Sequence, residues 1–157
     1  MLRRLALPIL GLALAAFAGA GAARDYIVVG STDPAIVRGQ AYDSGMRLTL
    51  APGRTVTLMH ASGDLVRLRG AEGGVLLPRR QSSQADAERL AILKVIVSTD
   101  QRGPGVTRPM RTRAGLCPEP ATITTLDAVV QVHQGGCSAE ATQALDAWIA
   151  AHPPKDA

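Results

Sequence analysis

Alternation of apolar and polar residues between residues 46 and 69 constrains this chain most. Two turn signals interrupt it: Pro52-Gly53 in the first and Ser62-Gly63 about ten residues later. A period of two places every second side chain on one face of a strand, and Pro-Gly suits the centre of a type II turn. The pattern predicts an antiparallel meander with one apolar face and one Arg/Thr face. The apolar set comprises Met46, Leu48, Leu50, Val56, Leu58, Val66 and Leu68, and the polar set includes Arg47, Thr49, Arg67 and Arg69.

The meander is expected to extend over residues 26–78. Residues 26–29 are β-rich and end at a glycine, which predicts a first strand, and residues 75–77 can add another before Pro78. Between them, the stretch from Gly39 through residues 48–58 to residues 62–64 and 68–70 resembles the β-rich periplasmic module of FecR-like proteins. The resemblance implies an extracytoplasmic β-domain that contacts other envelope proteins. Signalling members also have an inner-membrane helix and a cytoplasmic part, neither of which we expect here.

Residues 82–98 are predicted to form a buried helix, with a possible change to strand near Val95. Ser82 or Ser83 can cap it, and Asp86 suits the positive N-terminal end. Residues 99–116 follow as a basic loop rich in glycine, proline and arginine. This loop could contact an acidic protein face or an anionic envelope surface, or it could be a solvated linker.

Residues 117–152 are expected to be a disulfide-tied strand-helix unit. Residues 129–132 are rich in valine and predict a strand, and Ser138 can cap an amphipathic helix. The apolar face of that helix is predicted to hold Ala141, Leu145, Trp148, Ile149 and His152. Cys117 and Cys137 allow one intramolecular disulfide. The predicted fold class is therefore α+β, mainly β: a meander or small sandwich, then a helix, then the disulfide-tied unit.

Residues 1–22 have the order of a secretory signal peptide. Arg3 and Arg4 precede an apolar run, which ends in small residues that permit cleavage after Ala20 or Ala22. An uncleaved anchor is the alternative. Residues 23–157 are then one exported domain, most simply periplasmic and alternatively extracellular, with no transmembrane segment in the mature chain. Export also provides an environment in which the disulfide can persist.

Charge and aromatic content argue against nucleic acid as a partner. The chain has 17 basic and 13 acidic residues, and removal of Arg3 and Arg4 leaves 15 − 13 = +2. Aromatic residues make up 3% of the chain, so stacking platforms for bases are nearly excluded. The expected partner is instead an envelope protein.

Catalytic and metal-binding motifs are not found. His60, Ser62 and Asp64 lie close in sequence, but no G-x-S-x-G elbow is present, and His60 is interpreted as the solvent end of a strand. His133 and His152 lack metal-ligand spacing, so neither a metal nor a cofactor is expected.

The leading hypothesis is a non-catalytic, exported envelope protein that acts through protein-protein contact. Its expected surface is the Arg/Thr face, and the basic loop is second; the six residues are Arg47, Arg67, Arg69, Arg108, Arg111 and Arg113. The alternatives are an inhibitor of a secreted or envelope hydrolase, a solute-binding protein, and an uncharacterised enzyme. The enzyme would require a pocket that joins His60 or His133 to acids distant in sequence.

Overall fold

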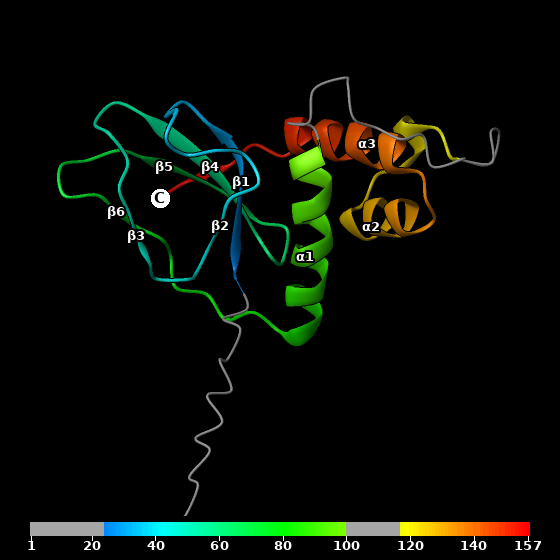
Figure 1. The fold of residues 1–157 in the computed structure, drawn as a ribbon, viewed down its shortest axis with the longest axis horizontal. Coiled ribbons are helices and arrows are strands. Elements are labelled where there is room, and N and C mark those ends of the chain that lie inside the picture. The colour runs from blue at the N-terminus through cyan, green and yellow to red at the C-terminus, as the bar shows by residue number, and fades with distance from the viewer. Residues whose placement is uncertain (1–23, 100–116) are drawn as a thin grey trace, which may run out of the picture.

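The computed structural model describes residues 24–99 and 117–157, and within them the chain forms a mixed α+β fold (Figure 1). A five-stranded sheet has the order β2-β1-β4-β5-β7, and β3 and β6 form a second, two-stranded sheet. The strands are β1 (Tyr26–Ser31), β2 (Ala41–Tyr42), β3 (Arg47–Leu48), β4 (Thr55–His60), β5 (Leu65–Arg69), β6 (Val75–Leu76) and β7 (Lys155–Asp156). The helices are α1 (Gln84–Thr99), α2 (Leu126–Gln134) and α3 (Ser138–Ala151), with a short 3₁₀ helix at Pro120–Thr122. The predicted signal peptide, residues 1–22, lies outside the described residues, and so does the predicted basic loop, residues 99–116, except for Thr99.

The β4–β5 hairpin confirms the centre of the predicted meander. The two strands pair antiparallel, with Val56 opposite Leu68 and Leu58 opposite Val66. Gly63, in the turn between them, has a φ of 99°, a left-handed conformation that favours glycine. The earlier turn also forms, since the Arg54 N–H donates to the Ala51 carbonyl at 3.0 Å.

The strand before that turn does not continue the meander. The predicted strand at residues 46–50 is reduced to β3, which pairs with β6 in the second sheet and not with β4. The place beside β4 is taken by β1, which pairs with it antiparallel from Tyr26–His60 to Ser31–Val56. Local alternation identifies strands correctly but cannot choose their neighbours, because that choice depends on contacts distant in sequence.

The large sheet is apolar on both faces near the helices. On the face toward the small sheet, Tyr26, Val28, Val56, Leu58, Val66 and Leu68 pack in one core with Leu48 and Leu50, which precede β4 in the chain. Met46, also predicted on the apolar face, is instead 46% exposed. On the opposite face, Ile27, Val29, Met59 and Leu65 join a second core with the helices. On this side of the large sheet, the exposed arginines of the predicted Arg/Thr face are Arg67 and Arg69.

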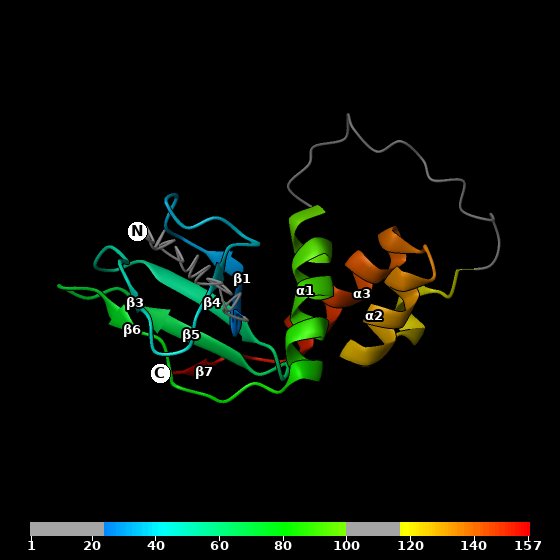
Figure 2. The same cartoon turned by 60° about the horizontal axis from the view of Figure 1, so that its bottom comes forward.

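Helix α1 stands between the sheet and the α2–α3 pair (Figure 2). Ser83 and Asp86 form the predicted cap reciprocally: the Asp86 N–H donates to Ser83 Oγ at 3.2 Å, and the Ser83 N–H donates to Asp86 Oδ2 at 3.0 Å. The helix remains helical through Val95 and buries one face only. Val95 itself is 54% exposed, which corrects the expectation of burial all round.

Residues 129–132 belong to helix α2, so the predicted strand is wrong. The hydroxyl of Thr125 accepts from the Ala128 N–H at 3.2 Å, and Asp127 lies in the first turn, where a negative charge is favourable. Val129 is fully buried in the helical core. Packing of this face against α1 and α3 outweighs the β propensity of the valines, which is a weak preference.

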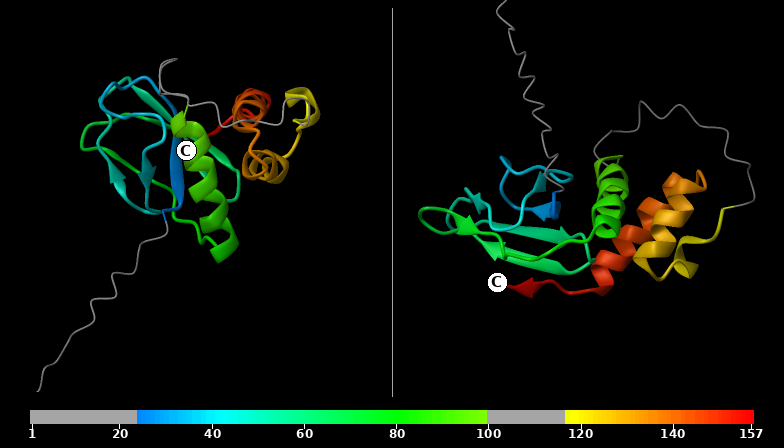
Figure 3. Two further views of the ribbon diagram at one scale, coloured as in Figure 1. Left: turned by 45° about the vertical axis from the view of Figure 1, so that its right-hand side comes forward. Right: turned by 90° about the horizontal axis from the view of Figure 1, so that it is seen from below.

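The C-terminal unit keeps the predicted disulfide and helix, but the predicted Ser138 cap is wrong: Ser138 is the first residue of α3, Cys137 precedes it, and no side chain of the described residues caps this helix end. Cys117 and Cys137 form the predicted disulfide, and α3 buries Ala141, Ala144 and Leu145 while Trp148 packs against the same core. His152, predicted on this face, is exposed. After Pro153 and Pro154, β7 returns to the sheet and pairs parallel with β5 (Figure 3). Within the described ranges, no helix combines the length and apolar character needed to cross a bilayer.

Candidate functional site

Two of the predicted arginines line a polar groove on the large sheet. Arg67 and Arg69 lie two residues apart on β5, so their side chains share one face, and both are exposed. Thr57 and Thr55 lie directly opposite them on β4. The groove has a volume of about 670 Å³, and its other lining residues include Ser31, Thr32 and Asp156. The structure thus gathers two guanidinium groups and several hydroxyls at the uncovered end of the sheet.

The groove brings together charges of both signs. Neither Arg67 nor Arg69 forms an ion pair with any residue of the described ranges, while Asp156 and Ala157 also line the groove. Arginine presents a planar fork of donors that matches a carboxylate. The groove can therefore accept an anionic group.

Arg47 does not join this groove. It lies on β3, where its guanidinium donates to the Gly73 carbonyl at 2.9 Å. The next residue, Leu48, enters the core between the sheets, so Arg47 points to the outside of the small sheet. Arg47 and the pair Arg67–Arg69 therefore lie on opposite outer faces of the β unit. Arg108, Arg111 and Arg113 lie outside the described residues.

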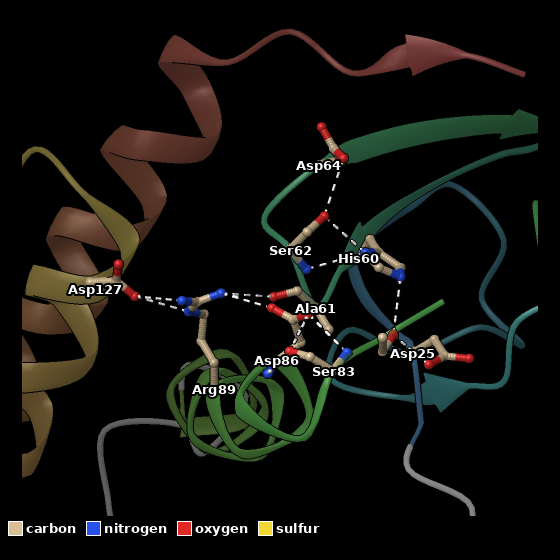
Figure 4. Close-up of polar contacts among 10 residues, drawn as sticks. Asp25, His60, Ala61, Ser62, Asp64, Ser83, Asp86, Arg89 and Asp127 are labelled. Carbon is tan, nitrogen blue, oxygen red and sulfur yellow. Dashed lines mark hydrogen bonds and ion pairs between the residues drawn. The ribbon is translucent and has the colours of Figure 1, made fainter. Parts of the chain in front are cut away.

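His60 lies at the centre of a polar cluster that the sequence revealed only in part. Its side chain is buried, with only 2% of the residue exposed, which corrects its interpretation as a solvent-end residue. Nε2 of His60 lies 3.2 Å from Ser82 Oγ, and that hydroxyl donates to Asp25 Oδ1 at 2.6 Å. Figure 4 shows Asp25, just before β1, close to His60 at the end of β4, and Ser82 comes from the segment before α1.

The other ring nitrogen of His60 contacts the β4–β5 turn. Nδ1 lies 2.9 Å from Ser62 Oγ and accepts from the Ser62 backbone N–H at 3.1 Å. Ser62 Oγ also lies 3.1 Å from Asp64 Oδ2, and Asp64 is ion-paired with Arg80. Histidine and serine two residues apart at a turn were the local signal for this half of the cluster. Nothing local indicated Asp25 or Ser82, which come from distant parts of the chain.

A second polar group, centred on Arg89, contacts the same turn from the helical side. The guanidinium of Arg89 contacts Asp86 on its own helix at 3.1 Å and Asp127 on α2 at 2.9 Å (Figure 4). It also donates to the Ala61 carbonyl at 3.4 Å. Arg89 therefore ties α1, α2 and the turn together, and we assign it a structural role.

Burial controls the protonation of His60. It lowers the pKa of the imidazole below its ordinary value of about 6.5, and the positive charge of Arg80 adds to this effect. Carboxylates oppose it, namely Asp25, Asp64 and Asp86. The pKa of Asp64 is lowered: burial acts to raise it, but hydrogen bonds from Ser62 and Arg80 and the charge of Arg80 outweigh burial. His60 is therefore neutral and Asp64 ionised at neutral pH.

We expect the stability of the protein to fall as the pH drops below about 6.5. In this range the unfolded chain gains a proton on His60 and the folded chain does not, so acidification favours unfolding. For one proton, the free energy of unfolding falls by at most about 1.4 kcal/mol per pH unit. The fall stops once the pH is below the pKa of His60 in the folded protein. The aspartates with lowered pKa values reduce the stability only in a separate pH range, below about 3.9. Urea unfolding of the wild type and of His60→Gln at several pH values would measure the difference, and equal slopes would contradict the prediction.

One group among the described residues has metal-ligand proximity: Cys117, Cys137 and Glu140. Both sulfur atoms belong to the disulfide, so this group offers no thiolate to an ion. We assign it no metal.

The chain was also compared with known proteins. No protein-family model, curated protein or solved structure matched it.

Proposed function

We propose that this chain is an exported envelope protein that binds a protein partner, with the groove at Arg67 and Arg69 as its contact. The observation that carries the proposal is the pair of guanidinium groups on one strand face, without an ion pair to any described residue. Two neighbouring guanidinium groups on one strand face favour binding of an anionic partner segment. The resemblance of residues 39–70 to FecR-like periplasmic modules is a further, independent support.

An extended acidic segment fits the groove best. Alternate residues on a strand lie roughly 6.8 Å apart, and acids at alternate positions of an extended peptide have the same spacing. Such a peptide can place one carboxylate opposite Arg67 and another opposite Arg69, while Thr55 and Thr57 offer hydroxyl groups to its backbone. Among the described residues no aromatic side chain lines the groove, which disfavours sugars and nucleobases as ligands.

The cysteine chemistry supports the exported location. The Cys117–Cys137 disulfide persists in an oxidising compartment such as the bacterial periplasm or the external medium. We propose the periplasm because the predicted signal peptide and the resemblance both favour it.

Reversing the charge of the groove is expected to weaken partner capture at least about tenfold, since interface charges guide encounter and a reversed charge repels an acidic segment. The variant is Arg67→Glu/Arg69→Glu, and Arg47→Glu on the opposite outer face is the matched control. Crosslinking in cells followed by purification and identification of the captured protein measures the effect. Loss of capture with Arg47→Glu alone, or full capture by the double variant, would show that the groove is not the partner contact.

The captured protein also decides between the two binding roles. A secreted or envelope hydrolase that loses its activity when mixed with the purified chain would identify an inhibitor. An envelope protein without such an activity would support an accessory role in a larger assembly.

A further inference from the structure

Ser62 combines an exposed position with a buried base. The residue lies on the turn between β4 and β5, and it lines a pocket of about 270 Å³ between this turn and the end of α3. Its hydroxyl oxygen is 2.9 Å from Nδ1 of His60, which is within direct proton-transfer distance. No residue of the binding groove belongs to this pocket.

The hydrogen bonds of His60 define its tautomer. Ser82 donates its only hydroxyl hydrogen to Asp25 at 2.6 Å, so towards Nε2 it can only accept. Nε2 therefore carries the ring hydrogen, and Nδ1 carries the lone pair. The backbone N–H of Ser62, which donates to Nδ1 at 3.1 Å, requires the same assignment. The basic nitrogen of the ring thus faces the Ser62 hydroxyl.

In the resting structure the Ser62 hydroxyl donates its hydrogen to Asp64 Oδ2 at 3.1 Å, and Nδ1 of His60 lies slightly closer to the same oxygen, at 2.9 Å. Rotation of the hydroxyl about the Cβ–Oγ bond redirects this hydrogen from Asp64 to Nδ1. The Asp64 carboxylate is also engaged by Arg80, with Lys155 at 4.0 Å, and these positive charges reduce its basicity. A neutral imidazole is a stronger base than such a carboxylate, so His60 is the group that can remove the proton.

We propose that Ser62 is a nucleophile, activated by His60, that accepts acyl groups from small esters. The Ser62 hydroxyl proton moves to Nδ1 while the oxygen forms a bond to the acyl carbon. The ester C–O bond then breaks, and the leaving alcohol takes the electron pair of that bond and the proton from Nδ1. The acyl group remains on Ser62 as a new ester, with no change of oxidation state and no other reactant.

The pocket limits the substrate to small acyl groups. Its volume is near the lower end of ligand-binding cavities, and Trp148 stacks on His152 at 4.0 Å to form a flat wall. Lys155 lies on the same lining, where its ammonium group can stabilise negative charge that develops on the acyl oxygen. Asp25 and Ser82 are positioning residues, because they act on substrate only through the ring of His60.

The test is covalent labelling of the full chain by p-nitrophenyl acetate, with the modified residue located by mass spectrometry. We expect acetyl transfer to Ser62, and a rate about a hundredfold lower in His60→Gln, which is typical of a lost general base. Ser138, an exposed serine at the start of α3, is the internal control. In the Ser138→Ala variant, Ser62 should be acetylated at the wild-type rate. Labelling of Ser62 no faster than Ser138 in the wild type overturns the proposal.

The pH profile separates activation from a structural role. With His60 as base, the labelling rate of the wild type should rise with pH and reach a plateau above the lowered pKa of His60. A rate that rises tenfold per pH unit up to pH about 9 indicates attack by hydroxide or free alkoxide and overturns the proposal. Asp25→Asn should slow labelling and move the profile while leaving a folded circular dichroism spectrum. Arg47→Glu, on the outer face of the small sheet and outside the Ser62 pocket, should label Ser62 at the wild-type rate.

Discussion

Replacing Gly70 with alanine is expected to destabilise the protein by about 3 kcal/mol or more, at the upper end of overpacking effects. A Cβ atom at this position would lie 1.9 Å from the Ala51 carbonyl oxygen and 2.8 Å from that of Leu50. Both obstructing atoms belong to the backbone, so no change of rotamer can relieve the contact. The chain must move at a point where the Gly70 N–H also donates to the Arg54 carbonyl at 2.8 Å.

Gly70 lies where the chain that leaves the small sheet passes close to the end of the β4–β5 hairpin. Residues 51–54 lead from the small sheet into β4, and Gly70 leads out of β5. Separation of these segments would disturb the core between the sheets and the adjacent Arg69. We therefore expect Gly70→Ala to weaken partner capture as well as stability.

Urea unfolding would measure the change, with Gly30→Ala as the matched control. Gly30 also lies on a strand of the large sheet, and an added Cβ there meets nothing within 4 Å. The control should lose less than about 1 kcal/mol, which is usual for substitutions away from tight contacts. Equal stability of the two variants would show that the backbone at residue 51 can move freely.

Removal of the disulfide is expected to cost roughly 3 kcal/mol. Cys117 and Cys137 are 20 residues apart, and the bridge limits the freedom of this loop in the unfolded chain. The loop contains the 3₁₀ helix and α2, and Val129 within it is fully buried. For a small domain this loss is a large share of the total stability, so the C-terminal unit should loosen first.

The variant Cys117→Ser/Cys137→Ser tests this expectation in urea. A reducing agent should lower the stability of the wild type to about that of the variant and leave the variant itself unchanged. Hydrogen exchange should show lost protection in α2 and α3 with the β4–β5 hairpin retained. A variant as stable as the oxidised wild type would mean that packing alone holds this unit.

The features that the sequence predicted correctly are local. Alternation identified β4 and β5, a glycine at each turn identified the bends, and Ser83 with Asp86 identified the start of α1. Each of these signals depends on residues within a few positions of one another, where backbone preferences and caps act directly. The disulfide was equally accessible because two cysteines permit only one intramolecular pairing.

Tertiary contacts decided the rest of the fold. Burial of Val129 made residues 126–134 a helix although valine favours strands, and β1 and β7 found their places through pairing with strands distant in sequence. Neither outcome can be derived from a local pattern, since the free energy that stabilises this helix and these strand pairings comes from surfaces that meet only in the folded chain.

The two candidate sites show the same division. Alternation alone placed Arg67 and Arg69 on one face, but only the sheet order separated them from Arg47. His60 and Ser62 were neighbours in the sequence, whereas Asp25 and Ser82 reached the imidazole through the β1–β4 pairing and the return of the chain before α1. The sequence by itself determined which side chains each short segment presents. The tertiary structure decided which of them meet, because burial and hydrogen bonding select contacts across the whole chain.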